Sequence, residues 1–237
     1  MPQTIAGTRR VLLLGMWTAW TIVVLYVVYI AVLFAGGVAV GVPREPYLAT
    51  AEILTSVGAL IQVGLVAVIH DSAPPRAKTL SLAALGWMLL MAGLTVTVHF
   101  VQLTVARRID LAATPELARL FGWEWPSLLY AIELVAWHLF LGLSLLFAAS
   151  AFRGRGAEAA VRVGLRVSGS LCIIGLVGPA LGNLNWRMIG VFGYGLVFPI
   201  VCVAIGLVFK RAASLHDDTT NGPTVARLSE QAAFDEL

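Results

Sequence analysis

Apolar residues occur along this chain in six long runs, each ended by polar residues or by Gly and Pro. Runs of roughly 18 or more apolar residues with few charges are typical of helices that cross a membrane. We expect spans at Val11–Ala35, Tyr47–Ile69, Leu80–Val105, Ser127–Phe152, Val163–Leu181 and Ile189–Phe209. At about 1.5 Å per residue, each is about as long as a hydrocarbon core requires. The pattern therefore predicts an all-α polytopic membrane protein, a bundle of six transmembrane helices.

The longest connection, Ala106–Pro126, carries the signals of a short helix of its own. Thr114 suits the N-cap position, and Pro115 suits the first position of a helix. Trp123 and Trp125 suit the interface between water and lipid, where an amphipathic ring is satisfied on both sides. We expect a short interfacial helix in this third loop, lying on the outer surface as a partial lid.

The two ends of the chain differ in character. The first apolar run is longer than the apolar region of a signal peptide, which has about 7–15 residues, so we expect it to be retained as the first span. From residue 212 onward the sequence turns polar. We therefore predict a six-span domain over residues 1–211 and a disordered cytoplasmic tail over residues 212–237.

Composition strengthens the membrane interpretation. The chain has 237 residues, of which 59% are hydrophobic and 12% charged, and its mean hydropathy is +0.88. Soluble domains carry about 25% charged residues. The net charge of +3 comes from arginines in loops, and the sequence contains no basic patch interleaved with aromatics of the kind that binds nucleic acid. Cys172 and Cys202 lie inside predicted spans, so we expect thiols and no metal-ligand motif.

Basic residues predict the orientation, because Lys and Arg accumulate in cytoplasmic loops. If the N-terminus is cytoplasmic, 11 of the 16 basic residues lie inside and five, Arg44, Arg107, Arg108, Arg119 and Arg187, lie outside. We therefore expect a protein of the cytoplasmic membrane with both termini in the cytoplasm.

Glycines are concentrated in the last two predicted spans. Gly178 and Gly182 form a pair four residues apart, and Gly190, Gly193 and Gly195 open the sixth span. Small residues let helices approach closely within a membrane. We expect these positions to serve helix packing, with oligomerisation through the same two helices as an alternative use.

Burying an ionisable residue inside a membrane costs free energy, so we expect each such residue to have a structural or functional role. The predicted spans contain four: Glu52, His99, Glu133 and His138. Glu52 and Glu133 follow the prolines that open their helices by six and seven residues, and His99 lies six residues before the end of its own. At 1.5 Å per residue these three groups lie roughly 9–11 Å from the outer ends of their helices. His138 lies deeper and on another face, so we expect it to bond to a neighbouring helix.

Helical phase places the three groups on polar faces. Glu52 shares a face with Thr55 and Gln62, while His99 shares one with Gln102. Since three polar stripes are best turned toward one another, the sequence predicts a Glu–His–Glu cluster in the outer half of the bundle. The candidate ligand- or ion-binding residues are Glu52, His99, Gln102 and Glu133.

Three interpretations of this cluster remain open. It can be a structural network that fixes helix packing, or a site where carboxylates bind or move a small molecule or a cation. It can also be a metal site of a membrane enzyme, with His99, Glu52 and Glu133 as ligands and an open position for water. Haem ligation by His99 and His138 is disfavoured, because the two lie at different depths. No reaction or cofactor follows from the sequence.

Arg107, Trp123, Trp125 and Arg187 stand near the predicted outer surface. They can gate access to the cluster or recognise an anionic group. Snorkelling of long side chains to the interface explains them equally well.

Three stretches carry a resemblance: 99–104 (HFVQLT), 125–131 (WPSLLYA) and 137–147 (WHLFLGLSLLF). They resemble an uncharacterised family of bacterial six-helix integral membrane proteins with no assigned function. The resemblance implies a bacterial cytoplasmic membrane and no activity. We therefore expect binding or transport of a small molecule or cation, with a metal-dependent membrane enzyme and a membrane scaffold for a partner protein as alternatives.

Overall fold

The computed structural model describes residues 7–40 and 42–220. Within these residues six helical segments are long and apolar enough to cross a membrane, which confirms the all-α six-helix bundle. The segments are Arg9–Ala35, Tyr47–Asp71, Pro75–Arg108, Leu128–Ala151, Ala157–Ala180 and Leu184–Leu215. Their length and composition indicate a multi-pass membrane protein.

The fourth and sixth spans are each built from several consecutive helical pieces, and the other four from one main helix each. The α-helices are α1 (Arg9–Ala35), α2 (Tyr47–Asp71), α3 (Lys78–Thr104), α4 (Pro115–Phe121), α5 (Leu128–Leu134), α6 (Leu141–Ala148), α7 (Ala157–Ala180), α8 (Arg187–Phe192) and α9 (Phe198–Thr220). Short 3-10 turns are η1 (Val38–Val40), η2 (Pro75–Ala77), η3 (Ala106–Arg108), η5 (Ala149–Ala151) and η6 (Leu184–Trp186). Two π-helical segments, η4 (Val135–Phe140) and η7 (Gly193–Val197), complete the set.

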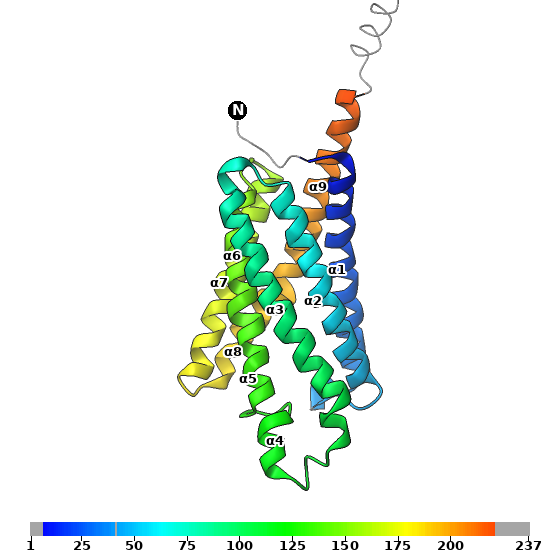
Figure 1. Cartoon of the computed structure of the whole chain (residues 1–237), viewed down its shortest axis with the longest axis vertical. Helices are drawn as coiled ribbons and strands as arrows, with labels where there is room; N and C mark the ends of the chain where they lie inside the picture. The colour runs from blue at the N-terminus through cyan, green and yellow to red at the C-terminus, as the bar shows by residue number, and fades with distance from the viewer. Residues whose placement is uncertain (1–6, 41, 221–237) are drawn as a thin grey trace, which may run out of the picture.

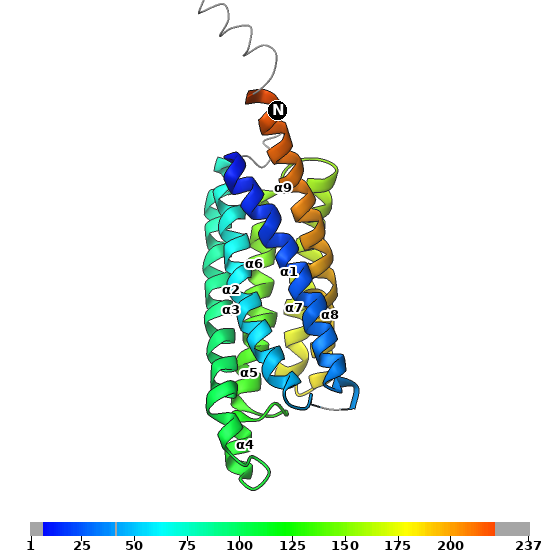
Figure 2. The same cartoon turned by 90° about the vertical axis from the view of Figure 1, so that its right-hand side faces the viewer.

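The spans pack as a closed ring. α1 packs against α2 and α9, α2 against α3, α3 against α6, α6 against α7, and α7 against α8 and α9. The first and last described residues lie at one end of the bundle, and α4 lies at the opposite end (Figures 1 and 2). We refer to these as the terminal end and the α4 end; the charge distribution predicts that the α4 end faces outward.

α1 is packed tightly at the terminal end only. Its buried residues, Leu12, Gly15, Met16, Ala19 and Ile22, all lie in the first half of the helix. A Cβ atom added at Gly15 would lie 2.8 Å from the Val68 side chain of α2 and 2.8 Å from the Phe209 ring of α9, so only glycine allows this approach. Toward the α4 end, α1 therefore leaves room between itself and the rest of the bundle.

The third loop confirms the predicted short helix. α4 begins at Pro115 and ends at Phe121, with Thr114 at the N-cap and Gly122 at the C-cap. The Thr114 side chain differs from the prediction: it makes no capping bond, and its hydroxyl donates to the carbonyl of Asp110 at 2.6 Å. The cap position was predictable from the sequence. The partner of the Thr114 hydroxyl was not, because its acceptor is a carbonyl of the same loop.

The polar tail starts later than predicted. α9 continues past residue 212 to Thr220, because helical hydrogen bonding does not require apolar side chains. Residues 212–220 are therefore helical, and the remainder of the predicted tail, residues 221–237, lies outside the described part. Cys172 and Cys202 are buried free thiols, as predicted.

The glycines of the last two spans serve contacts within the chain. A Cβ atom at Gly175 would lie 2.8 Å from the Gly190 Cα atom, so α7 and α8 meet backbone to backbone. Gly182 lies beyond the end of α7 with φ of 84°, a turn conformation, and is not the second member of a packing pair. Gly195 has only a Val191 side-chain atom of its own span near its Cβ position. Oligomerisation through these helices stays a prediction.

Candidate functional site

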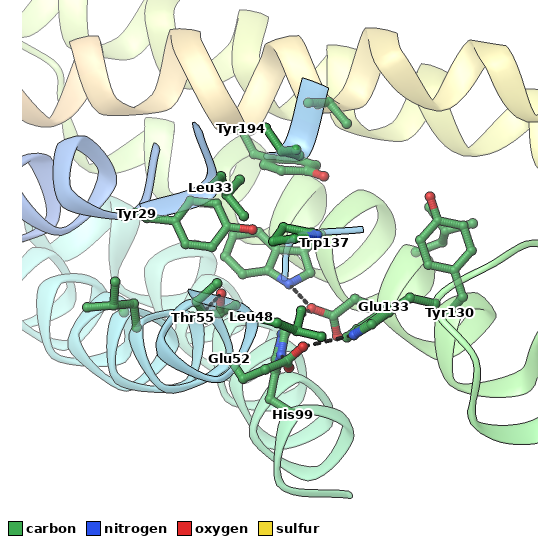
Figure 3. A pocket seen from close by; sticks show the side chains of 18 of the residues that line it. Tyr29, Leu33, Leu48, Glu52, Thr55, His99, Tyr130, Glu133, Trp137 and Tyr194 are labelled. Carbon is green, nitrogen blue, oxygen red and sulfur yellow. Dashed lines mark hydrogen bonds and ion pairs between the residues drawn. The ribbon is translucent and has the colours of Figure 1, made fainter. Parts of the chain in front are cut away.

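Glu52, His99 and Glu133 converge from three helices at the α4 end of the bundle (Figure 3). His99 on α3 stands between the two carboxylates. Its Nδ1 atom contacts Glu52 Oε2 on α2, and its Nε2 atom lies 2.9 Å from Glu133 Oε1 on α5. Glu52 and His99 are 4% and 6% exposed. The arrangement predicted from helix depth is thus present, and we call these three residues the triad.

Two tryptophans complete the hydrogen bonding of the triad. Trp123, in the loop after α4, donates its indole N–H to Glu52 Oε1 at 2.8 Å. Trp137 donates its own to Glu133 Oε1 at 2.6 Å. Both Glu52 oxygens and one Glu133 oxygen therefore have a partner. The other, Glu133 Oε2, is buried and has no hydrogen-bond partner within the described part of the chain.

The two contacts of His99 fix the minimum charge of the triad. Each contact between a ring nitrogen and a carboxylate oxygen needs one shared proton, since two lone pairs cannot bond to each other. An imidazolium between two carboxylates meets this condition, as does a neutral imidazole between one carboxylate and one protonated carboxyl group. Both states carry a net charge of −1, and a third proton on the triad would bring its charge to zero.

The triad borders a cavity of about 700 Å³ between the second half of α1 and the rest of the bundle. Cavities of this size hold drug-sized ligands. The polar and aromatic side chains that line it are Tyr26, Tyr29, Glu52, Thr55, Gln62, His99, Trp123, Glu124, Tyr130, Glu133, Trp137, His138, Arg187 and Tyr194. Tyr26 OH and Gln62 Oε1 are buried without a hydrogen-bond partner among the described residues. Because such atoms are costly to leave unpaired, the cavity suits a polar ligand or ordered water.

The two π-helical segments meet at one wall of the cavity. The Trp137 and Tyr194 rings lie 5.2 Å apart, and the His138 and Tyr194 rings lie 5.6 Å apart. π-Helical turns are rare and are frequently found at functional sites. They were not predicted, because the helical phase was counted at about 100° per residue throughout. The wider turn brings Glu133, Trp137 and His138 to the same cavity.

His138 also confirms its predicted bond to a neighbouring helix. Its Nε2 atom donates to the carbonyl oxygen of Arg187 on α8 at 3.1 Å. The ring of His138 is buried against Gly175 and Gly190. His99, by contrast, has both ring nitrogens on the carboxylates of the triad. The two histidines therefore have separate partners.

The four residues predicted as a gate separate into two pairs. Trp123 and Arg187 line the cavity, and the Arg187 guanidinium lies over the Tyr130 ring at 5.8 Å. Trp125 packs edge-on against Tyr130, with ring centroids 6.2 Å apart, and is not among the residues that line the cavity. Arg107 forms an exposed ion pair with Glu45 at 3.1 Å. Only the first pair is placed to affect the cavity.

Gln102 shares a buried face with His99 but does not join the triad. Its side-chain amide donates to the carbonyl oxygen of Phe121, the last residue of α4, at 2.7 Å. Its place in the structure is therefore to hold the α4 loop against α3. α4 lies at this end of the bundle (Figure 1), and its use as a partial lid stays a prediction.

The geometry does not favour the metal alternative. No group of three or more His, Cys, Asp or Glu side chains across residues 7–40 and 42–220 is arranged to hold a metal ion. The physical reason at the triad is that both nitrogens of His99 already share protons with carboxylates. A metal ligand needs a free nitrogen lone pair.

Tyr26, Tyr29 and Tyr194 are members of the cavity that the sequence analysis did not select. The sequence contained a signal that could have identified them: they are tyrosines within predicted spans, whereas tyrosine in membrane proteins is enriched at the interfaces. Tyr26 and Tyr29 lie three residues apart, so they share a face of α1.

Comparisons of the chain with models of protein families, with curated proteins and with solved structures find no match.

Proposed function

We propose that the cavity binds a small organic cation, such as an ammonium ion attached to an apolar body. One observation carries this proposal: Glu133 lines the cavity, and one of its carboxylate oxygens, Oε2, is buried and lacks a hydrogen-bond donor in the described chain. A cationic donor satisfies this oxygen and neutralises the charge. Buried charges in membranes are otherwise expensive.

Aromatic rings around the carboxylates support a cation over other polar ligands. Tyr29, Trp137 and Tyr194 surround the side of the cavity onto which Glu133 opens (Figure 3). The faces of such rings attract cations, by about 0.5–2 kcal/mol each depending on desolvation. Carboxylate and aromatic groups together thus recognise the charged end of an amine.

Apolar side chains in the lining suit the body of the ligand. Leu25 and Leu33 of α1, with Met188 and Val191 of α8, line the cavity. The polar groups come mainly from α2, α3 and α5. Arg187 and Glu124 have opposite charges and cancel in the charge balance of the cavity, so the negative charge of the triad remains.

The proposal is tested by ligand-dependent thermal stability of the protein in lipid nanodiscs. Phenethylammonium and the uncharged phenethyl alcohol differ only at the charged group. We expect the cation to stabilise the protein, by about 2.7 kcal/mol at a hundredfold excess over its Kd, and the alcohol to have a much smaller effect. Glu133→Gln should abolish the difference, while Glu116→Gln, an exposed change on α4, should preserve it.

A structural network is the second candidate function, favoured by the donors that three of the four carboxylate oxygens already have. It predicts that Glu52→Gln and Glu133→Gln lower the thermal stability of the bundle and that no organic cation stabilises the wild type. A series of aralkylammonium ions of increasing size, all without effect on a folded wild-type protein, would exclude the cation site.

A further inference from the structure

Glu133 Oε2 differs from the other carboxylate oxygens of the triad. Trp123 and His99 supply donors to both oxygens of Glu52, while His99 and Trp137 both reach Glu133 Oε1. Glu133 lines the cavity, and its Oε2 atom is buried and has no donor within residues 7–40 and 42–220. A buried anionic oxygen without a donor is unfavourable. Either a proton on the oxygen or a cation beside it removes the penalty.

We infer that Glu133 Oε2 is a shared site for one proton and one organic cation, so that the binding of either displaces the other. This inference rests on the proposed function, since it requires that the cavity binds a cation. It adds a second ligand, the proton, and makes the cavity a site of proton–cation exchange.

The exchange balances in atoms and in charge. With the proton on Glu133 Oε2, the His99 imidazolium donates to Glu52 and to Glu133 Oε1, and the triad has a net charge of zero (−1, +1 and 0). When the cation binds, the O–H bond of Glu133 breaks, the proton passes to water, and the carboxylate forms an ion pair with the cation. The triad then carries −1 and the ligand +1. The total buried charge does not change, so neither state leaves an unpaired charge in the low-dielectric interior.

Among the described residues that line the cavity, no second carboxylate oxygen is buried without a donor. Glu124 is exposed, the Arg187 guanidinium lies over the Tyr130 ring, and His138 donates to the Arg187 carbonyl. The titratable groups around Glu133 in the cavity are Tyr26 and Tyr29 of α1, Glu52 of α2, His99 of α3, Glu124 of the loop, Tyr130 of α5, His138 of η4, Arg187 of α8 and Tyr194 of η7. The exchange is therefore assigned to Glu133 alone.

Calorimetry of the wild-type protein in nanodiscs tests the inference. Benzyltrimethylammonium is the probe, because it has no titratable proton and any proton released comes from the protein. Titrations in buffers of different ionisation enthalpy give the number of protons released. We expect about one proton released per bound cation, and a Kd that falls as the pH rises, because binding displaces a proton.

Two variants locate the released proton. Glu133→Gln should remove both the binding and the proton release. Glu116→Gln removes an exposed carboxylate of α4 that does not line the cavity and should leave the proton count unchanged. If Glu133→Gln does not fold, the wild-type proton count still decides the matter.

The outcomes separate the two proposals. Cation binding with about one released proton supports the exchange. Binding without proton release, at a Kd that does not depend on pH, overturns the exchange and leaves the cation site intact. No binding of this probe or of aralkylammonium ions to the folded wild type overturns both.

Discussion

Gly190 determines how closely α8 approaches the wall of the cavity. A Cβ atom at this position would overlap the His138 ring, which is buried and donates to the Arg187 carbonyl one turn earlier on α8. The His138 ring cannot move away easily, because Gly175 of α7 packs on it as well. One glycine thus connects the position of His138 with that of Arg187.

Gly190→Ala should therefore destabilise the protein by about 1–3 kcal/mol, the usual cost of overpacking a core. It should also weaken cation binding, because α8 carries Arg187, Met188 and Val191 of the cavity wall. Gly93→Ala on α3 is the matched control: its Cβ atom meets no atom within 4 Å, and alanine is the better helix former. Thermal unfolding in detergent compares the two, and equal stabilities would refute this account of Gly190.

At the scale of single elements, the loop after α4 connects this helix to the triad. Gln102 holds the carbonyl of Phe121, and Ser127 donates to the carbonyl of Gly122 at 2.5 Å. Between these two bonds the loop turns Trp123 inward onto Glu52. The loop after α4 therefore supplies a donor to the site.

Gln102→Ala should loosen this loop by removing one hydrogen bond, worth about 0.5–1.5 kcal/mol. Hydrogen exchange should become several-fold faster over residues 115–126 and remain unchanged in α7. Thr104→Ala is the control, because the Thr104 hydroxyl donates back to Phe100 of its own helix. Unchanged exchange in Gln102→Ala would show that α4 is held by its other contacts.

The same elements show what the sequence could and could not predict. The depths of Glu52, His99 and Glu133 follow from counting residues from prolines and helix ends, so their convergence was predictable. Trp123 on Glu52 was not, since loop conformation does not follow from periodicity. The π-helical turns of η4 and η7 were missed because a uniform 3.6-residue period was assumed across both spans.

At the scale of the whole molecule, the closed ring places the described ends of the chain at one end and the α4 lid at the other (Figure 2). The distribution of arginines predicts that the terminal end is cytoplasmic. With that orientation, the cavity, which lies toward the α4 end, is on the side from which the proposed cation would enter, either from the outer half of the membrane or from the medium beyond it.

Cysteine labelling tests this orientation. Ala112→Cys lies exposed before α4, and Ala160→Cys lies exposed near the start of α7, at the terminal end. In intact cells a membrane-impermeant thiol reagent should label the first, and should label the second only after permeabilisation. The native Cys172 and Cys202 are buried and should not react. The reverse pattern would show that the bundle has the opposite orientation.

The π-helical segments also limit which insertions and deletions the chain tolerates. A π-helical turn holds one residue more than the α-helical turn it replaces, so deleting a residue from Val135–Phe140 would leave a regular α-helix. Such a helix would still cross a membrane and would keep Glu133 in phase with α6, but Trp137 and His138, which lie within the turn, would no longer both face the cavity. Over evolutionary time, a single codon lost in either π segment would therefore change the wall of the cavity and leave the fold that carries it intact.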